Sequence, residues 1–155
     1  MKLKNVCSGW WIAALAAVLD RITKIWAPAH PLEVRGLFRF RSALMNSGVA
    51  FSFLENAGWA LTVLIAILVI AVVAWLVCER DMPKAQRIGL WLIVGGGIGN
   101  LYDRIVYGAV IDFIEITFMH FAVFNLADVC VCVGAAIAIL GMLIGEKRKN
   151  AGKTV

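Results

Sequence analysis

Charged residues are scarce in this chain of 155 residues: they make up 16% of it, whereas hydrophobic residues make up 62%. A soluble domain averages about 25% charged and about 45–50% apolar residues, so both values depart in the direction typical of membrane proteins. Charge is almost absent from two long runs: Gly58–Cys78 contains none, and Leu126–Gly145 contains only Asp128. Since about 20 helical residues cross a bilayer core of about 30 Å, each run is long enough to span a membrane.

Metal-binding and redox patterns are also missing. The four cysteines do not have the spacing of a zinc or thiol–disulfide motif, and the two histidines are isolated from each other. We interpret the cysteines as small apolar side chains that fill space in the helices. The sequence therefore predicts neither a metal site nor a cofactor.

Four apolar segments predict one membrane domain, residues 1–155, with four transmembrane helices. The predicted spans are about 7–25, 59–78, 87–107 and 125–145. We interpret the first as a permanent helix rather than a cleaved signal peptide, because no small-x-small cleavage site follows its apolar core. Between the spans, about 27–57 contains an alternating stretch typical of a short strand or hairpin. The aromatic segment of about 108–124 predicts an interfacial segment, interpreted as a short helix along the outer leaflet.

The net charge of +5 reflects topology rather than nucleic-acid binding. With four spans, nine basic residues fall on one side of the membrane, and six fall on or near the other. The nine are Lys2, Lys4, Arg80, Lys84, Arg87, Lys147, Arg148, Lys149 and Lys153. Because Lys and Arg are enriched in cytoplasmic loops, both termini are predicted to be cytoplasmic.

Ionisable residues inside membrane segments cost about 2.5–3.5 kcal/mol each on insertion scales and mark functional sites. Here the polar residues gather near the outer ends of three predicted spans and in the segment that joins two of them. They are Asp20, Lys24, Asn100, Asp103, Arg104, Asp112, Asn125 and Asp128. With both termini inside, all of them converge on the outer leaflet.

A pair of aspartates is the catalytic pairing that this cluster offers. Two carboxylates close together in a low dielectric share one proton, so one can activate a water while the other polarises a carbonyl. Asp20 has a lysine one turn further along its helix, and Asp103 is followed by Arg104, so we interpret both as structural. Asp112 and Asp128 have no cationic neighbour in sequence and are the candidate dyad.

An ion or solute pathway is the alternative function. A pathway needs polar groups along its length, however, and the second predicted span has almost none. The third span contains Gly95-Gly96-Gly97-Ile98-Gly99, which lacks the lysine of a phosphate loop. Small residues instead allow membrane helices to approach closely.

Five short blocks, in this order, resemble the lipoprotein signal peptidase (signal peptidase II) family, the intramembrane aspartyl protease family A8. They are Asp20–Lys24, Asn46–Phe51, Gly96–Arg104, Val110–Phe113 and Phe124–Asp128. The family often has alanine where this chain has Gly97. The resemblance covers nearly the whole chain.

The resemblance implies an all-α membrane protein with a small β element: four transmembrane helices, an outer-face β-cradle and a short periplasmic helix. It implies an aspartyl endopeptidase of the bacterial inner membrane, with its site near the periplasmic leaflet. Its substrates would be diacylglyceryl-modified prolipoproteins, cut on the N-terminal side of the lipidated cysteine. Membrane lipid and globomycin-type inhibitors are implied partners, whereas no cofactor and no nucleic acid are expected, and we expect a monomer.

The family's motifs also imply roles for individual residues. The catalytic residues would be Asp112 and Asp128. The residues lining the site would be Asn46, Gly48, Asn100, Arg104 and Asn125. The supporting residues would be Asp20, Lys24 and Asp103. We further expect the segment Asn46–Phe53 to close over the scissile bond, and the signal peptide to lie between the helices, against the glycine cluster if those residues face it.

Overall fold

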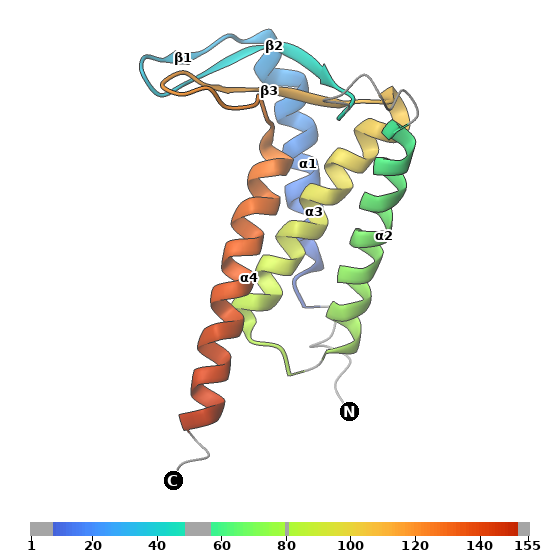
Figure 1. Ribbon diagram of the computed structural model, residues 1–155, viewed down its shortest axis with the longest axis vertical. Coiled ribbons are helices and arrows are strands. Elements are labelled where there is room, and N and C mark those ends of the chain that lie inside the picture. The colour runs from blue at the N-terminus through green and yellow to red at the C-terminus, as the bar shows by residue number, and fades with distance from the viewer. Residues whose placement is uncertain (1–7, 49–56, 80, 152–155) are drawn as a thin grey trace.

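The computed structural model describes residues 8–48, 57–79 and 81–151, and in it four long helices form a bundle with a small sheet across one end (Figure 1). The helices are α1 (Trp10–Trp26), α2 (Ala57–Cys78), α3 (Lys84–Tyr107) and α4 (Leu126–Ala151), and a short 3-10 helix, η2 (Ala27–Ala29), follows α1. The strands are β1 (Glu33–Val34), β2 (Phe38–Asn46) and β3 (Val110–Ile116). The prediction of a helical protein with a small β element is confirmed.

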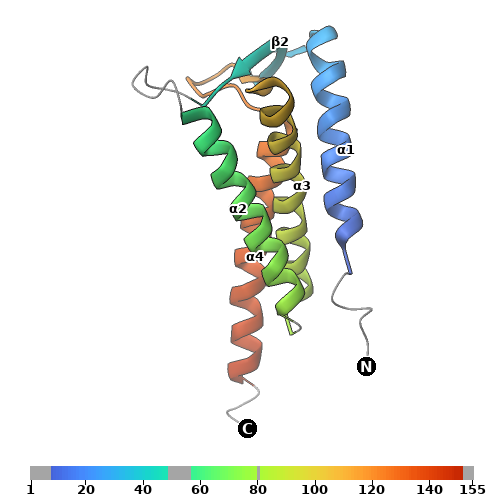
Figure 2. The same ribbon diagram turned by 90° about the vertical axis from the view of Figure 1, so that its right-hand side faces the viewer.

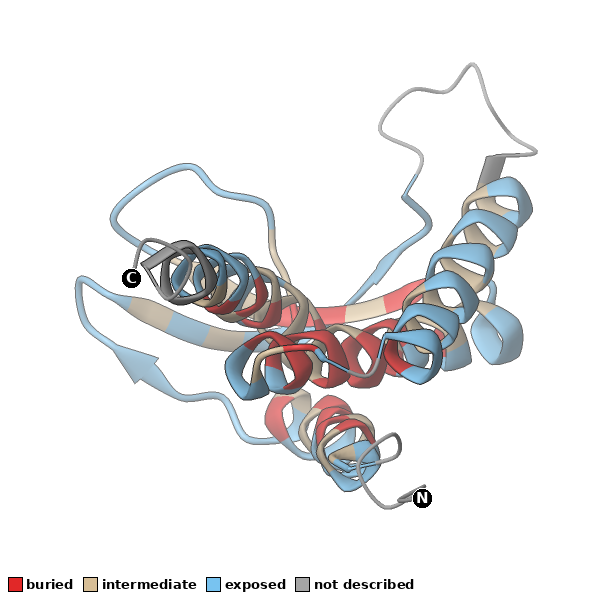
Figure 3. Ribbon diagram, turned by 90° about the horizontal axis from the view of Figure 1, so that it is seen from below, coloured by how far each residue is buried: buried red, intermediate tan, exposed pale blue. Residues whose placement is uncertain are grey.

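Among the described helices, two are long and apolar enough to cross a membrane. These spans are Gly58–Cys78, with a mean hydropathy of 3.1, and Leu126–Glu146, with 2.4. The span in α2 is only 6% buried, and Figure 3 shows α2 as a mixture of exposed and intermediate residues, as expected of a helix with one side toward lipid. α1 has only 17 residues, and α3 carries charged residues at both ends, so neither meets the same standard.

α3 is the central helix and packs against the other three (Figures 2 and 3). Glycine makes the contacts close. A Cβ added at Gly134 of α4 would lie 2.6 Å from the carbonyl oxygen of Gly89 in α3, which leaves no room for a side chain. Such close backbone approach is the usual way in which membrane helices associate, because lipid provides no hydrophobic force between them.

The glycine cluster of α3 serves the same purpose. Gly95 faces α1, where a Cβ would lie 2.7 Å from the carbonyl oxygen of Ala13, and Gly96 faces the backbone of Ala127 in α4. Gly97 faces α2, where an added Cβ would lie 2.6 Å from a methyl group of Val69. The prediction of close helix packing is confirmed. Gly95 and Gly96 pack against α1 and α4, whereas Gly97 also lines a groove between α2, α3 and α4.

The sheet is antiparallel throughout, in the order β1-β2-β3. Its hairpin, β1 and β2, confirms the strand predicted within 27–57. The helix predicted within 108–124 is wrong, because Val110–Ile116 is strand β3, paired with β2. α3 ends at Gly108, whose φ of +73° favours glycine, and the β-branched residues that follow suit a strand.

The sheet lies at one end of the bundle, and the start of α1 and the end of α4 lie at the other (Figure 1). This arrangement is the one expected of four spans with an outer-face β element. The predicted closing segment falls mostly on residues 49–56, which lie outside the described residues.

Candidate active site

The N-terminus of α4 holds one candidate carboxylate in a reciprocal pair of hydrogen bonds. The backbone N–H of Asp128 donates to Asn125 Oδ1 at 3.0 Å, and the backbone N–H of Asn125 donates to Asp128 Oδ2 at 3.1 Å. This is the geometry of a capping box, in which two residues three apart satisfy each other's free N–H groups. The helix N-terminus also favours a negative charge, so Asp128 is held where its ionised form is stabilised.

The second candidate carboxylate, Asp112, lies on β3 and is only 2% exposed. Asn46 Nδ2 donates to its Oδ2 at 2.8 Å, and Asn125 Nδ2 donates to its Oδ1 at 2.7 Å. Asn46 reaches Asp112 because β2 bulges between Phe40 and Leu44, which shifts the register of the strand that carries it. Bulges beside active sites commonly redirect a side chain in this way.

Asn100 of α3 completes the link between the two aspartates. Its Nδ2 donates to Asp128 Oδ1 at 2.7 Å, and its Oδ1 accepts from Asn125 Nδ2 at 3.2 Å. Asn125 thus contacts both Asp112 and Asn100, and Asn100 contacts Asp128. The sequence analysis expected these four residues to lie together, and the structure places them in one hydrogen-bonded array.

Below this array lies a buried ion-pair network centred on Lys24, whose side chain is 0% exposed. Its ammonium donates to Asp20 Oδ2 and Asp103 Oδ2, both at 2.8 Å, and to Asn100 Oδ1 at 3.0 Å. The predicted Asp20–Lys24 pair is therefore present. The cationic partners of Asp103 are Lys24 and Arg21, both on α1, and not the adjacent Arg104 as expected.

Arg104 lies on the outer side of the array. Its Nη1 donates to the carbonyl oxygen of Ser47 at 3.2 Å, while its Nε is buried without a hydrogen-bond partner among the described residues. Gly48 has a φ of +75°, and a Cβ there would lie 2.7 Å from Leu61 and 3.1 Å from the Arg104 guanidinium. The residues predicted to line the site therefore do gather around the two carboxylates.

Sequence reasoning missed two contributors. Arg21 follows Asp20 directly and has no predicted role in the site. It pairs with Asp103 and lies over the rings of Tyr102 and Tyr107, 5.3 and 5.7 Å from their centroids. Gly99 was read as a packing glycine, but a Cβ there would overlap Asp20 Oδ2. Both depend on contacts between α1 and α3 that helical spacing within one segment does not reveal.

Gly99→Ala is expected to destabilise the protein by about 1–3 kcal/mol, because the added methyl must displace a carboxylate that is already fixed. Asp20 is fixed by Lys24 and by the backbone N–H of Ala127, which donates to Asp20 Oδ1 at 2.9 Å. Thermal melting in detergent checks the loss. Gly58→Ala is the matched control, since the nearest described atom would lie 4.0 Å from its Cβ. Equal melting temperatures for the two variants would contradict the prediction.

Burial shapes the electrostatics of the dyad. Desolvation raises the pKa of Asp112 above its ordinary value, more than the hydrogen bonds from Asn46 and Asn125 lower it, and the charge of Asp128 raises it further. The raised pKa makes Asp112 easier to protonate than a free carboxyl group, whereas Asp128 lies at the positive end of the α4 dipole. The two carboxylates are chemically unequal, as an acid and a base must be.

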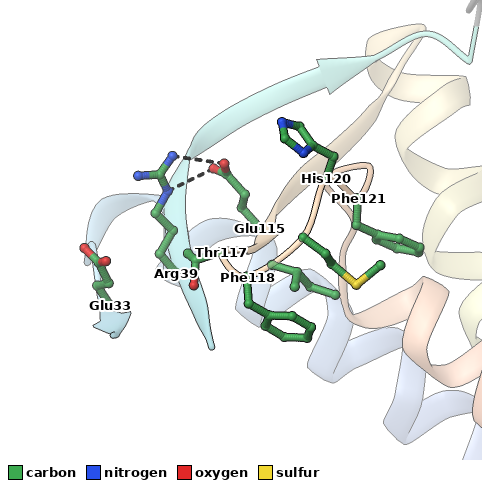
Figure 4. A pocket seen from close by; sticks show the side chains of 9 residues that line it. Glu33, Arg39, Glu115, Thr117, Phe118, His120 and Phe121 are labelled. Atoms are coloured by element: carbon green, nitrogen blue, oxygen red, sulfur yellow. Dashed lines mark hydrogen bonds and ion pairs between the residues drawn. The ribbon is translucent and has the colours of Figure 1, made fainter. Parts of the chain in front are cut away.

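Two cavities differ in their relation to this array. A groove of about 280 Å³ reaches Asn100 and Asp128, and apolar side chains of α2, α3 and α4 line the rest of it. A larger pocket of about 650 Å³ lies at the outer part of the sheet, around the Arg39–Glu115 ion pair and Phe118 (Figure 4). Hydrogen bonds from Arg39 hold the pKa of Glu115 below its ordinary value. None of the candidate site residues lines that pocket, whereas Asn100 and Asp128 both line the apolar groove.

The fold and the site together define a class: a membrane protein with a buried carboxylate–amide array at one end of its helices. Comparison with known proteins identifies the family. The family model described as Signal peptidase (SPase) II matches residues 12–144. Lipoprotein signal peptidases from Yersinia pestis (strain Pestoides F) and Yersinia pseudotuberculosis serotype I (strain IP32953) are each 39% identical over 163 residues, covering 96% of this chain and 96% of the relative.

Solved structures agree on the fold. One, described as "Bacterial membrane enzyme structure by the in meso method at 2.3 A resolution", has a TM-score of 0.76 at 24% identity and covers 92% of this chain and 91% of that chain. A second, described in the same words but at 1.9 A resolution, has a TM-score of 0.77 at 25% identity. It covers 88% of this chain and 92% of that chain. The chain belongs to the signal peptidase II family. The resemblance noted in the sequence is confirmed, and the transporter alternative is not favoured.

Proposed function

We propose that Asp112 and Asp128 are the catalytic dyad with which this signal peptidase II removes signal peptides from diacylglyceryl-modified prolipoproteins. One observation carries the proposal. Asp20 and Asp103 each form an ion pair with the buried ammonium of Lys24. In the described part of the site, Asp112 and Asp128 are instead linked to each other through hydrogen bonds with neutral asparagine amides. The enzyme is therefore an aspartic endopeptidase in this proposal.

In this proposal the two aspartates take different roles, because Asp112 is buried with a raised pKa and Asp128 caps the N-terminus of α4. Asp128 takes a proton from a water whose oxygen attacks the scissile carbonyl carbon. Asp112, protonated in its buried position, donates its proton to the carbonyl oxygen. The resulting tetrahedral diol collapses and the C–N bond breaks: Asp128 gives its proton to the leaving amine of the new N-terminal cysteine, and one diol hydroxyl returns a proton to Asp112, which restores the starting state of the dyad. The dyad titrates as one unit throughout.

Charge balance supports a single proton on the dyad. Within the described part of the site, four carboxylates (Asp20, Asp103, Asp112 and Asp128) face three cations (Arg21, Lys24 and Arg104). One shared proton makes this cluster neutral. An uncompensated buried charge is strongly destabilising, so the singly protonated dyad is the state that the surroundings favour.

The groove explains how the substrate is placed. It is apolar along α2, α3 and α4 and polar only where it meets Asn100 and Asp128. A signal peptide helix can occupy this groove from the lipid side while the diacylglyceryl chains remain in the bilayer, where each buried CH₂ contributes about 0.8 kcal/mol. The cut then falls on the N-terminal side of the lipidated cysteine, and the unpartnered Nε of Arg104 can bind a substrate carbonyl.

The proposed setting is the bacterial inner membrane. All four helices span it, both termini are cytoplasmic, and the sheet and dyad lie at the periplasmic leaflet. The same groove would hold globomycin-type inhibitors. We retain the predictions that the enzyme acts as a monomer without a cofactor.

A side-by-side cleavage assay tests this function. A lipidated precursor in mixed micelles should be cut, and a non-lipidated precursor of identical sequence should be a very poor substrate, because the lipid fixes the cysteine at the level of the dyad. A chelator should leave the rate unchanged. Mass spectrometry of the products identifies the cut.

Comparable rates on the two precursors would show that the peptide alone is recognised. Loss of cleavage in chelator, restored by added metal, would contradict the two-aspartate chemistry. Globomycin is the control for specificity, since it should abolish cleavage of the lipidated precursor.

A further inference from the structure

Three asparagines surround the dyad, and in each the amide oxygen accepts from a group that can only donate. Asn46 Oδ1 accepts from the backbone N–H of Gly48 at 2.9 Å, and Asn125 Oδ1 accepts from that of Asp128 at 3.0 Å. Asn100 Oδ1 accepts from the ammonium of Lys24 at 3.0 Å. Because an amide has its oxygen on one side and its NH₂ on the other, fixing the oxygen aims the NH₂ in the opposite direction.

All three NH₂ groups are aimed at carboxylates. Asn46 and Asn125 donate to Asp112, and Asn100 donates to Asp128 at 2.7 Å. Two of the three fixing groups are backbone N–H groups, which no side-chain substitution removes. The third is the side chain of Lys24, which comes from a different helix, α1.

Lys24 is placed so that it cannot turn away. All three of its ammonium protons are used, on Asp20, Asp103 and Asn100, and its side chain is 0% exposed. Asn125 Nδ2 also donates to Asn100 Oδ1, at the longer distance of 3.2 Å. With an apolar side chain at position 24, this neutral bond alone among the described contacts would oppose a turn of the Asn100 amide that presents its oxygen to Asp128. An oxygen facing a carboxylate repels the ionised form, whereas an N–H donor stabilises it.

We propose that Lys24 is a positioning residue for catalysis: through the Asn100 amide it keeps a donor on Asp128 and so makes Asp128 the base of the dyad. This inference rests on the proposed function, because it presupposes that Asp128 takes the proton from water. Other charged groups also face Asp128: Arg104 from α3, Asp112 from β3, and the Lys24–Asp20 pair from α1. Of these, Lys24 is the one hydrogen-bonded to the amide that binds Asp128.

The pH dependence of kcat/KM measures the effect. In Lys24→Met the acidic limb, where the base becomes protonated, should move to higher pH by about one to two units, which corresponds to the loss of one hydrogen bond to a charged group. Asn100→Leu should move the same limb in the same direction. The double variant should move it no further than either single variant, since Lys24 acts through Asn100.

A charge-matched double variant serves as the control for effects on folding. Lys24→Met combined with Asp103→Asn removes one cation and one carboxylate, so the buried cluster stays neutral and the variant is the one to use if Lys24→Met alone does not fold. Asp103→Asn alone keeps the Lys24–Asn100 bond, so its limb should stay at the wild-type pH even though its melting temperature falls. Lys24→Gln offers an N–H to Asn100 without a charge, so its acidic limb should lie between that of the wild type and that of Lys24→Met.

The outcomes separate the inference from the proposed function. A limb that stays at the wild-type pH in Lys24→Met, or shifts that add in the double variant, would overturn the positioning role while the dyad stands. If Asp128→Asn retains cleavage, the dyad assignment itself fails. A limb that moves equally in Asp103→Asn and in Lys24→Met would show that the network acts only through general electrostatics, and the inference would be wrong.

Discussion

Asp112→Asn and Asp128→Asn are each expected to lower turnover by at least about 10²–10⁴-fold, because an amide can neither take a proton from water nor give one to the carbonyl. Both variants should fold. Asn at position 112 is nearly isosteric with the protonated acid that burial favours there. In Asp128→Asn, the remaining carboxylate of the dyad can ionise and keep the buried cluster neutral.

Cleavage of the lipidated precursor, followed over time, measures this loss, and binding of the same precursor shows that the groove is intact. Asp81→Asn is the matched control. Asp81 is exposed, lies between α2 and α3 and does not contact the array, so its variant should cleave at the wild-type rate. Turnover within tenfold of wild type in either dyad variant would remove that aspartate from the mechanism.

Asp103→Ala is expected to cost about 3–5 kcal/mol of stability and to be more damaging than Asp112→Ala. Asp103 is 0% exposed and is paired with Arg21 and Lys24. Its removal leaves Arg21 without this carboxylate and leaves the buried Lys24 with Asp20 as its one carboxylate among the described residues. It also accepts from the backbone N–H of Ile111 at 3.2 Å, which connects α3 to the start of β3. Within the described part of the chain, the side chain of Asp112 accepts hydrogen bonds from the neutral amides of Asn46 and Asn125, and an unmade bond of that kind costs about 1–3 kcal/mol.

Melting temperatures of the detergent-solubilised variants test this ranking. Glu115→Ala is a useful reference, because its ion pair with Arg39 lies on the surface of the sheet and contributes at most about 1 kcal/mol. A larger loss for Asp112→Ala than for Asp103→Ala would mean that the structural and catalytic aspartates have been exchanged.

Helical spacing predicted the parts of the site that lie within one segment. Asp20 and Lys24 are four apart, and Asn125 and Asp128 are three apart, so each pair shares a helix face, and both pairs are in contact. Their meeting at one level followed from the alternation of spans across the membrane. These inferences needed only periodicity and the position of each residue along its helix.

Contacts between segments were not predictable in the same way. The sequence offered Asp103 a cation in the next residue, but the fold supplies Lys24 and Arg21 from α1 instead. Asp112 and Glu115 are three apart, which a helix would also permit, and this concealed a strand whose β-branched residues favour the sheet. Pairing with β2, a tertiary interaction, decided the outcome.

The buried network also constrains how the protein is made. α1 carries Asp20 and Lys24, and α3 carries Asp103, and each such charge opposes entry into the bilayer by about 2.5–3.5 kcal/mol. Their neutralisation is complete only when α1 and α3 meet, after α2 has been synthesised between them. In the proposed four-span topology, we therefore expect α1 to be stable in the bilayer only once α3 is available to pair with it. Substitutions in the network should reveal themselves first as newly made chains lost to membrane quality-control proteases, before any defect in the chemistry is measured.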